Sequence, residues 1–178
     1  MRVLAALCVA LLVAAAAQAG EWVGASAPAV KLPDQNGKVV DLASYRGQWV
    51  ALYFYPKNNT PGCTEEAKQF RDHHAALKEK GVAVIGVSVD DVESHRDFAK
   101  KLQLPFTLLA DVDGTVAKAF GVLRGFGPVK FAGRETFLID PEGTIVYHYP
   151  DVNSRTHAEQ VLRDVAGVQQ AESSAQQR

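Results

Sequence analysis

Cysteine is scarce in this sequence. The 178 residues contain two, Cys8 and Cys63. A disulfide scaffold needs several cysteine pairs and a cysteine-based zinc site needs more sulfur ligands, so the count excludes both classes.

An excess of one charge is also absent. Lys and Arg number 19 and Asp and Glu number 20, so the formal net charge is -1, and no run is rich in Lys or Arg. This balance gives no electrostatic basis for binding nucleic acid or an anionic membrane surface, and we expect neither partner. The chain is 47% hydrophobic and is long enough to bury one core, which predicts a single globular domain.

The apolar stretch at the N-terminus, Val3 to Ala17, is shorter than the roughly 20 residues that span a bilayer. Arg2 precedes it, and Ala17-Gln18-Ala19 places small residues where a signal peptidase cleaves. We therefore predict a signal peptide over residues 1–19 and an exported protein, with the periplasm as the expected compartment. A retained membrane anchor is the less favoured alternative, because no stop-transfer charges follow the run. Cleavage removes Cys8 and leaves Cys63 as the single cysteine.

From Trp22 onward, strand-like and helix-like segments alternate, which predicts an α/β domain over residues 20–168. An Asn-Gly turn within 34–37 separates two short apolar pieces and predicts an N-terminal β-hairpin. Continuous apolar runs at 49–55 and 82–89 predict strands buried on both faces, joined by one continuous helix from Cys63 to Leu77.

The second half of the chain continues this alternation. We expect a helix at 93–102, a strand at 106–110, an antiparallel pair at 136–140 and 144–149, and a closing helix at 156–166. The segment Gly125 to Pro128 is expected to be a loop near Arg134. Residues from Gln169 to Arg178 offer nothing apolar to bury, which predicts a disordered tail.

The segment most informative about chemistry lies where the strand at 49–55 leads into the following helix. Thr60 followed by Pro61 is a helix start, because threonine can cap free amides and proline fits the first helical position. Cys63 then falls in the first turn, where free N–H groups and the helix dipole favour a thiolate. The sequence thus indicates a reactive cysteine, although a buried cysteine can also be a small apolar filler.

Several classes of cysteine chemistry are excluded by the residues near Cys63. His73 and His74 lie ten and eleven residues further along a helix, about 15 Å away, so neither can be the base of a Cys-His hydrolase. Glu66 stands where a Cys-x-x-Cys reductase has its second cysteine, and Ala67 where a Cys-x-x-x-Cys copper chaperone has it.

The residues around Cys63 resemble the peroxiredoxins, and within them the bacterioferritin comigratory protein or peroxiredoxin Q group. Pro56, Thr60 and Cys63 meet the P-x-x-x-T-x-x-C signature of that family. The resemblance extends from about Val23 to Val165 and includes motifs elsewhere: Ala27-Pro28, Tyr45-Arg46-Gly47, Leu108-Leu109-Ala110-Asp111 and Arg134-Glu135-Thr136-Phe137-Leu138-Ile139-Asp140.

This resemblance implies a thioredoxin-like fold with an N-terminal hairpin and a mixed sheet flanked by helices. It also implies that the Cys63 thiolate attacks a hydroperoxide and becomes a sulfenic acid. Thr60 and Arg134 are the implied donors at the reacting atoms, and Pro61 shields the sulfur; the alternatives are a helix cap for Thr60 and a surface ion pair for Arg134. The implied supporting residues are Pro56, Gly62 and Glu66, of which Glu66 could equally be a solvated acid. No cofactor or metal is implied.

One position departs from the commoner pattern of the group. Many members carry a resolving cysteine five residues after the first, and this chain has Lys68 there. We therefore expect a one-cysteine mechanism, in which an external thiol such as a thioredoxin-like protein or a small thiol reduces the sulfenic acid of a monomer or weak homodimer. The alternative is a peroxide sensor or holdase that uses the same cysteine without turnover.

Overall fold

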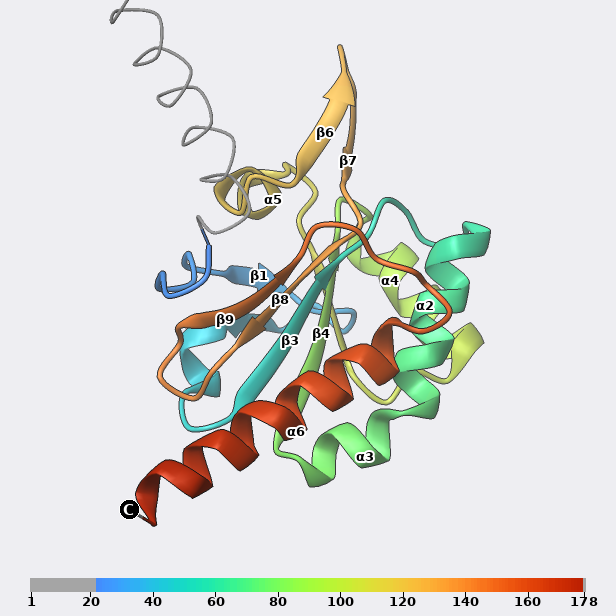
Figure 1. The fold of residues 1–178 in the computed structure, drawn as a ribbon. Helices are drawn as coiled ribbons and strands as arrows, with labels where there is room; N and C mark the ends of the chain where they lie inside the picture. The colour runs from blue at the N-terminus through green and yellow to red at the C-terminus, as the bar shows by residue number, and fades with distance from the viewer. Residues whose placement is uncertain (1–21, 178) are drawn as a thin grey trace, which may run out of the picture.

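The computed structural model describes residues 22–177, so the predicted signal peptide lies outside the described residues. A five-stranded sheet with the order β5-β4-β3-β8-β9 forms the centre of the fold (Figure 1). β3, β4 and β5 run parallel, whereas β8 is antiparallel to β3 and to β9, so the predicted mixed sheet is confirmed. The strands are β3 (Trp49–Phe54), β4 (Val82–Ser88), β5 (Thr107–Ala110), β8 (Glu135–Ile139) and β9 (Ile145–Tyr149).

Two layers cover the sheet. One contains α2 (Pro61–Asp72), α3 (His74–Glu79), α4 (Val92–Leu102) and α6 (His157–Gln176), and Figure 1 shows α6 crossing the sheet on this side. The other contains α5 (Thr115–Ala119) and the residues next to the predicted N-terminal hairpin. That hairpin is confirmed as β1 (Lys31–Pro33) paired with β2 (Val39–Asp41), and a short 3-10 helix, η1 (Leu42–Tyr45), follows it.

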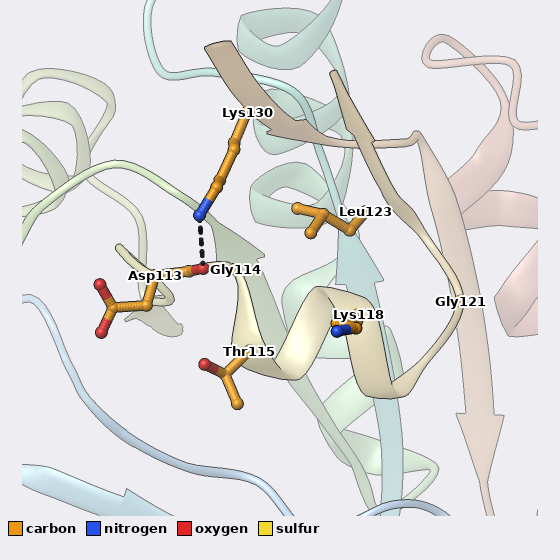
Figure 2. Close-up of a pocket in the computed structure, with 7 residues that line it drawn as sticks. All are labelled: Asp113, Gly114, Thr115, Lys118, Gly121, Leu123 and Lys130. Carbon is orange, nitrogen blue, oxygen red and sulfur yellow. Dashed lines mark hydrogen bonds between the residues drawn. The ribbon is translucent and has the colours of Figure 1, made fainter. Parts of the chain in front are cut away.

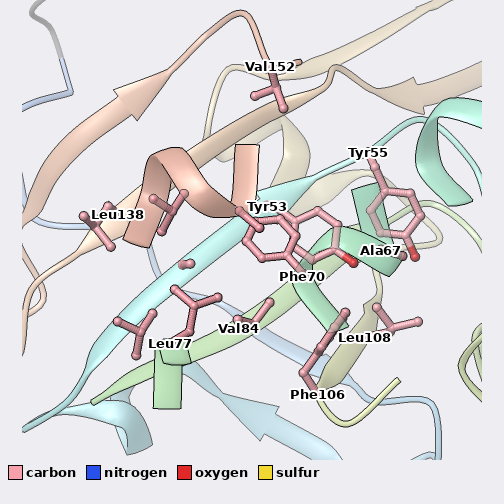
Figure 3. Close-up of a cluster of buried hydrophobic side chains, with 14 of the residues drawn as sticks. Tyr53, Tyr55, Ala67, Phe70, Leu77, Val84, Phe106, Leu108, Leu138 and Val152 are labelled. Carbon is pink, nitrogen blue, oxygen red and sulfur yellow. The ribbon is translucent and has the colours of Figure 1, made fainter. Parts of the chain in front are cut away.

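The central strand β3 is buried on both faces because its side chains alternate between two apolar clusters. Ala51 and Tyr53 point into the cluster under α2 and α6, which Figure 3 shows, whereas Leu52 and Phe54 point into the opposite one. Tyr53 stacks on Phe70 of α2 with ring centroids 4.7 Å apart. This packing fixes α2, and with it Cys63, against the end of β3.

The continuous helix predicted from Cys63 to Leu77 is wrong in one respect, since α2 ends at Asp72 and α3 begins at His74. At the junction, the His73 ring Nδ1 lies 2.9 Å from the Gln69 carbonyl oxygen, which the His73 backbone N–H also contacts at 3.0 Å. The break falls at His73, whose backbone φ of -96 and ψ of 1 lie outside the helical range.

The predicted disordered tail is also wrong, because α6 continues past Ala166 to Gln176. Ala, Gln and Glu are good helix formers, and the propensity of this stretch suffices without a buried face. The Gln169 side chain donates to the Lys80 carbonyl oxygen at 2.8 Å, which ties this part of the helix to the end of α3.

The segment Gly125 to Pro128 is not simply a loop. Leu123–Phe126 forms β6 and Val129–Ala132 forms β7, and the two pair as a hairpin that projects from the domain (Figure 1). Gly125 has φ +140, and a Cβ there would collide with the Val129 carbonyl oxygen, so this register requires glycine. β7 leads directly to Arg134, which places the hairpin next to the site.

Because His157 is buried, we expect the free energy of unfolding to fall in acid. Burial lowers the pKa of His157 from 6.5 to about 4, and its Nε2 lies 2.8 Å from the Thr136 hydroxyl in the core. Between these two pKa values the imidazole of His157 is protonated in the unfolded chain and neutral in the folded chain. The free energy of unfolding should therefore drop by about 3 kcal/mol as pH falls from 6.5 to about 4. Urea unfolding at several pH values measures this. His157→Gln should flatten the curve across that range, and an equally steep curve in the variant would contradict the assignment.

Candidate active site

Cys63 lies in the first turn of α2, as predicted, and is 1% exposed. Pro61 is the first helical residue, and no acidic side chain stands in the first turn. The free N–H groups and the positive end of the helix dipole therefore favour negative charge on the sulfur, and no carboxylate in the same turn opposes this effect. The local sequence thus places a buried sulfur where negative charge is favoured.

Thr60 precedes the helix, but the expectation that its side chain caps the helix is wrong. Its hydroxyl donates to the Lys57 carbonyl oxygen at 3.0 Å and makes no bond to a helix amide. The hydroxyl hydrogen is used in this bond, and the oxygen lone pairs remain available to accept a hydrogen bond from another molecule.

Arg134 reaches the site from the segment between β7 and β8, 71 residues along the chain from Cys63. One guanidinium nitrogen, Nη2, donates to the Cys63 Sγ at 3.2 Å, and the other, Nη1, donates to Glu66 Oε2. The predicted surface ion pair is therefore not what Arg134 forms, since its side chain is 21% exposed and its partner is 0% exposed. A cation thus lies against the sulfur.

Gly62 lies against the Arg134 guanidinium. A Cβ at Gly62 would lie 3.0 Å from Arg134 Nη2, the atom that contacts the sulfur. A side chain here would crowd the guanidinium atom that contacts Cys63 and require it to shift by a few tenths of an ångström, which supports a positioning role for Gly62.

Glu66 is fully buried on the inner face of α2, so the alternative of a solvated acid is wrong. Burial raises the pKa of Glu66 to about 7, and the Arg134 guanidinium opposes this. The Oε1 atom of Glu66 and the hydroxyl of Tyr53 are both buried without a hydrogen-bond partner among the described residues.

Sequence reasoning missed a polar network that holds the loop before α2. The Tyr55 hydroxyl donates to Asn58 Oδ1 at 2.8 Å, and His95 Nδ1 of α4 lies 3.2 Å from that same hydroxyl. Asp90 accepts the Asn58 backbone N–H at 2.8 Å. The signal available in the sequence was Asn58, a polar residue in the short loop between the buried strand β3 and α2, but its side-chain and backbone partners Ser94, His95 and Asp90 come from a distant segment.

The remaining predicted residues lie at the surface around this centre. Pro61 is exposed, and Pro56 is half-buried and lines a cavity of about 420 Å³ with Lys57 and residues of β7. A larger cavity, about 670 Å³, lies elsewhere, between α5 and the β6–β7 hairpin, and no predicted site residue lines it (Figure 2). The size of a cavity therefore does not identify the reactive centre here.

Residues 22–177 contain no group of three or more His, Cys, Asp or Glu side chains arranged to hold a metal ion. The helices within the same range are each too short or too polar to cross a membrane.

The geometry suits a nucleophilic sulfur that attacks a small, polar electrophile. The sulfur has a cation at 3.2 Å, a helix N-terminus beside it and a hydroxyl with free lone pairs three residues earlier. The guanidinium can donate to an oxygen that develops negative charge as a bond to it breaks. Because the sulfur is 1% exposed, the structure favours a small reacting group.

Comparisons with known proteins agree with this chemistry. The profile of the AhpC/TSA family matches residues 23–148. Peroxiredoxin Bcp of Bacillus subtilis is 41% identical over 146 residues, covering 79% of this chain and 92% of that protein. The chloroplastic peroxiredoxin Q of Triticum aestivum is 46% identical over 127 residues, covering 71% of this chain and 58% of that protein.

A solved structure is similar in fold as well. The bacterioferritin comigratory protein of Xanthomonas campestris, described as having alkyl peroxide reduction activity, superposes with a TM-score of 0.73. It is 33% identical and covers 78% of this chain and 90% of that chain. The predicted thioredoxin-like peroxiredoxin fold is therefore confirmed.

Proposed function

The chain belongs to the AhpC/TSA family as a thiol-dependent peroxiredoxin of the Bcp and peroxiredoxin Q group, and from this we propose that it works by a one-cysteine mechanism. Cys63 reduces hydrogen peroxide and organic hydroperoxides to water or alcohols and becomes a sulfenic acid. An external thiol, either a thioredoxin-like protein or a small thiol, then reduces that acid.

The contact between Arg134 and Cys63 carries the proposal for the first step. The thiolate attacks one peroxide oxygen, the O–O bond breaks, and negative charge moves to the leaving oxygen. The Arg134 guanidinium stabilises the thiolate before the attack and can donate to the leaving oxygen after it. The Thr60 hydroxyl donates to the Lys57 carbonyl oxygen, and its oxygen accepts a hydrogen bond from the peroxide O–H and so orients the substrate.

The position of Lys68 supports the one-cysteine step. Lys68 is in α2, five residues after Cys63, where many members of the group have a second cysteine. Cys8, the other cysteine of the chain, falls within the predicted signal peptide. Once residues 1–19 are removed, Cys63 has no partner within its own chain.

Mass spectrometry tests this step. The chain from Gly20 to Arg178 is treated with one equivalent of hydrogen peroxide, with and without a thiol that traps sulfenic acids. We expect a sulfenic acid or a Cys63-to-Cys63 dimer, and steady peroxide consumption when a thiol donor is added. A single turnover that no thiol restores would instead support a peroxide sensor or holdase.

Thr60→Val should lower the rate of peroxide reduction by about 10²-fold, because the substrate loses the acceptor that orients it. Stopped-flow measurement of sulfenic acid formation gives this rate. The matched control is Thr64→Val, one turn further along α2, which should keep the wild-type rate. Equal rates in the two variants would contradict the role of the Thr60 hydroxyl.

Export is proposed on the sequence pattern of residues 1–19. Expression of the full chain in a Gram-negative bacterium should give a periplasmic protein whose first residue is Gly20. An intact N-terminus in the cytoplasmic fraction would contradict this.

A further inference from the structure

Cys63 and Glu66 share one cation. Arg134 donates to the Cys63 Sγ through Nη2 and to Glu66 Oε2 through Nη1, and the two acids are 1% and 0% exposed. If both were ionised, the buried site would carry two negative charges against one positive charge. An uncompensated buried charge is costly, so simultaneous ionisation of the pair is disfavoured.

The surroundings of the second carboxyl oxygen of Glu66, Oε1, indicate which oxygen carries the proton when Glu66 is neutral. Oε1 is buried and has no hydrogen-bond partner among the described residues, whereas Oε2 accepts from Arg134. A charged oxygen left without a donor costs more than a neutral one, so the arrangement favours a carboxyl group protonated at Oε1. Burial also raises the pKa of Glu66 to about 7.

The groups around Glu66 offer no second cation. Tyr53 of β3 and Tyr55, which follows that strand, lie near it, and burial raises the pKa of each hydroxyl well above 10, so both stay neutral. The neighbouring helices α4 and α6 bring His95 and His157, and burial lowers the pKa of both imidazoles. Both histidines are therefore neutral at neutral pH, so within residues 22–177 Arg134 is the cation that balances the two acids.

We propose, on the basis of the peroxidase function above, that Glu66 holds a proton on Oε1 while Cys63 is a thiolate and gives it up when the sulfur is oxidised. The thiolate, the hydroperoxide and the neutral carboxyl group become a sulfenic acid, an alcohol and a carboxylate. The sulfur loses two electrons to the O–O bond. The leaving oxygen gains the proton that Glu66 loses, and the charge of the site stays constant.

This assignment makes the carboxyl group the internal proton source of the reaction. Ionising one of the two acids raises the cost of ionising the other, because they share the Arg134 guanidinium. Oxidation removes the negative charge from the sulfur, so Arg134 can then pair fully with a Glu66 carboxylate.

The test compares the wild type with Glu66→Gln, which has the same shape, keeps a carbonyl for Arg134 and cannot ionise. The control is Glu65→Gln, the adjacent acid, whose Oε1 accepts from the Gln69 side chain 3.3 Å away. Thiolate is followed by its ultraviolet absorbance against pH. Proton uptake during one turnover with hydrogen peroxide is followed with an indicator dye in weak buffer near neutral pH.

We expect the wild type and Glu65→Gln to show thiolate absorbance and to take up no proton when Cys63 is oxidised. Glu66→Gln should form thiolate at the same pH as the wild type, because the carboxyl group it replaces is neutral while the sulfur is a thiolate, and should take up one proton for each Cys63 oxidised. Proton uptake of one in the wild type, or thiolate that forms at a pH lower by about one unit or more in Glu66→Gln, would overturn the proposal, since that shift would mean that Glu66 is ionised before the sulfur. Failure of the wild type to be oxidised at all would overturn the peroxidase function instead.

Discussion

Cys63→Ser should abolish peroxide reduction, with a loss of at least about 10³-fold in the steady-state rate with a thiol donor. Serine has nearly the same shape, but its hydroxyl neither ionises at neutral pH nor accepts an oxygen atom reversibly. The helix start and the Arg134 guanidinium therefore have no thiolate to stabilise.

The fold of the Cys63→Ser variant should be unchanged, because the replaced atom is small and sits at the end of α2 near polar groups. Circular dichroism and the denaturant midpoint provide the check. Peroxide reduction at the wild-type rate by a folded Cys63→Ser variant would remove the basis of the proposed function.

Arg134→Ala should lower the rate of sulfenic acid formation by about 10²- to 10³-fold, because the thiolate and the leaving oxygen lose their donor. It should also reduce the free energy of unfolding by about 3 kcal/mol at neutral pH, since Glu66 becomes a buried acid without a cation. Burial then keeps the folded-state pKa of Glu66 above its unfolded value. The folded chain binds more protons than the unfolded one, so the loss of stability grows as pH rises.

A double variant separates the two effects of Arg134. Glu66→Gln combined with Arg134→Ala should recover most of the stability, because no buried carboxyl group remains, but should stay slow in peroxide reduction. The matched control is Arg124→Ala, which removes a half-exposed arginine that pairs with Glu135 and not with Cys63. A comparable loss of rate in Arg124→Ala would indicate a general effect of lost charge.

The strand and helix order could be predicted because its signals are local. The apolar run ending at Tyr55 predicts a strand buried on both faces, and Thr60-Pro61 predicts the start of α2. The extension of α6 to Gln176 was missed because it depends on helix propensity, whereas the prediction relied on buried faces.

The position of the reactive cysteine could also be predicted from neighbouring residues in the sequence. Its electrostatic surroundings could not, because they come from distant segments. Whether Glu66 is solvated or buried depends on Arg134, which arrives from 68 residues away. The same holds for His95, which reaches the loop before Cys63 from α4 and has no distinguishing pattern in its own segment.

The rate constant for oxidation of Cys63 by hydrogen peroxide tests directly whether Cys63 is the thiolate that reduces peroxide. It is measured by competition with free cysteine at neutral pH and by mass spectrometry of the Cys63 peptide. We expect one oxygen atom to be added to Cys63, at a rate at least about 10³-fold above that of free cysteine. A rate equal to that of free cysteine would contradict it.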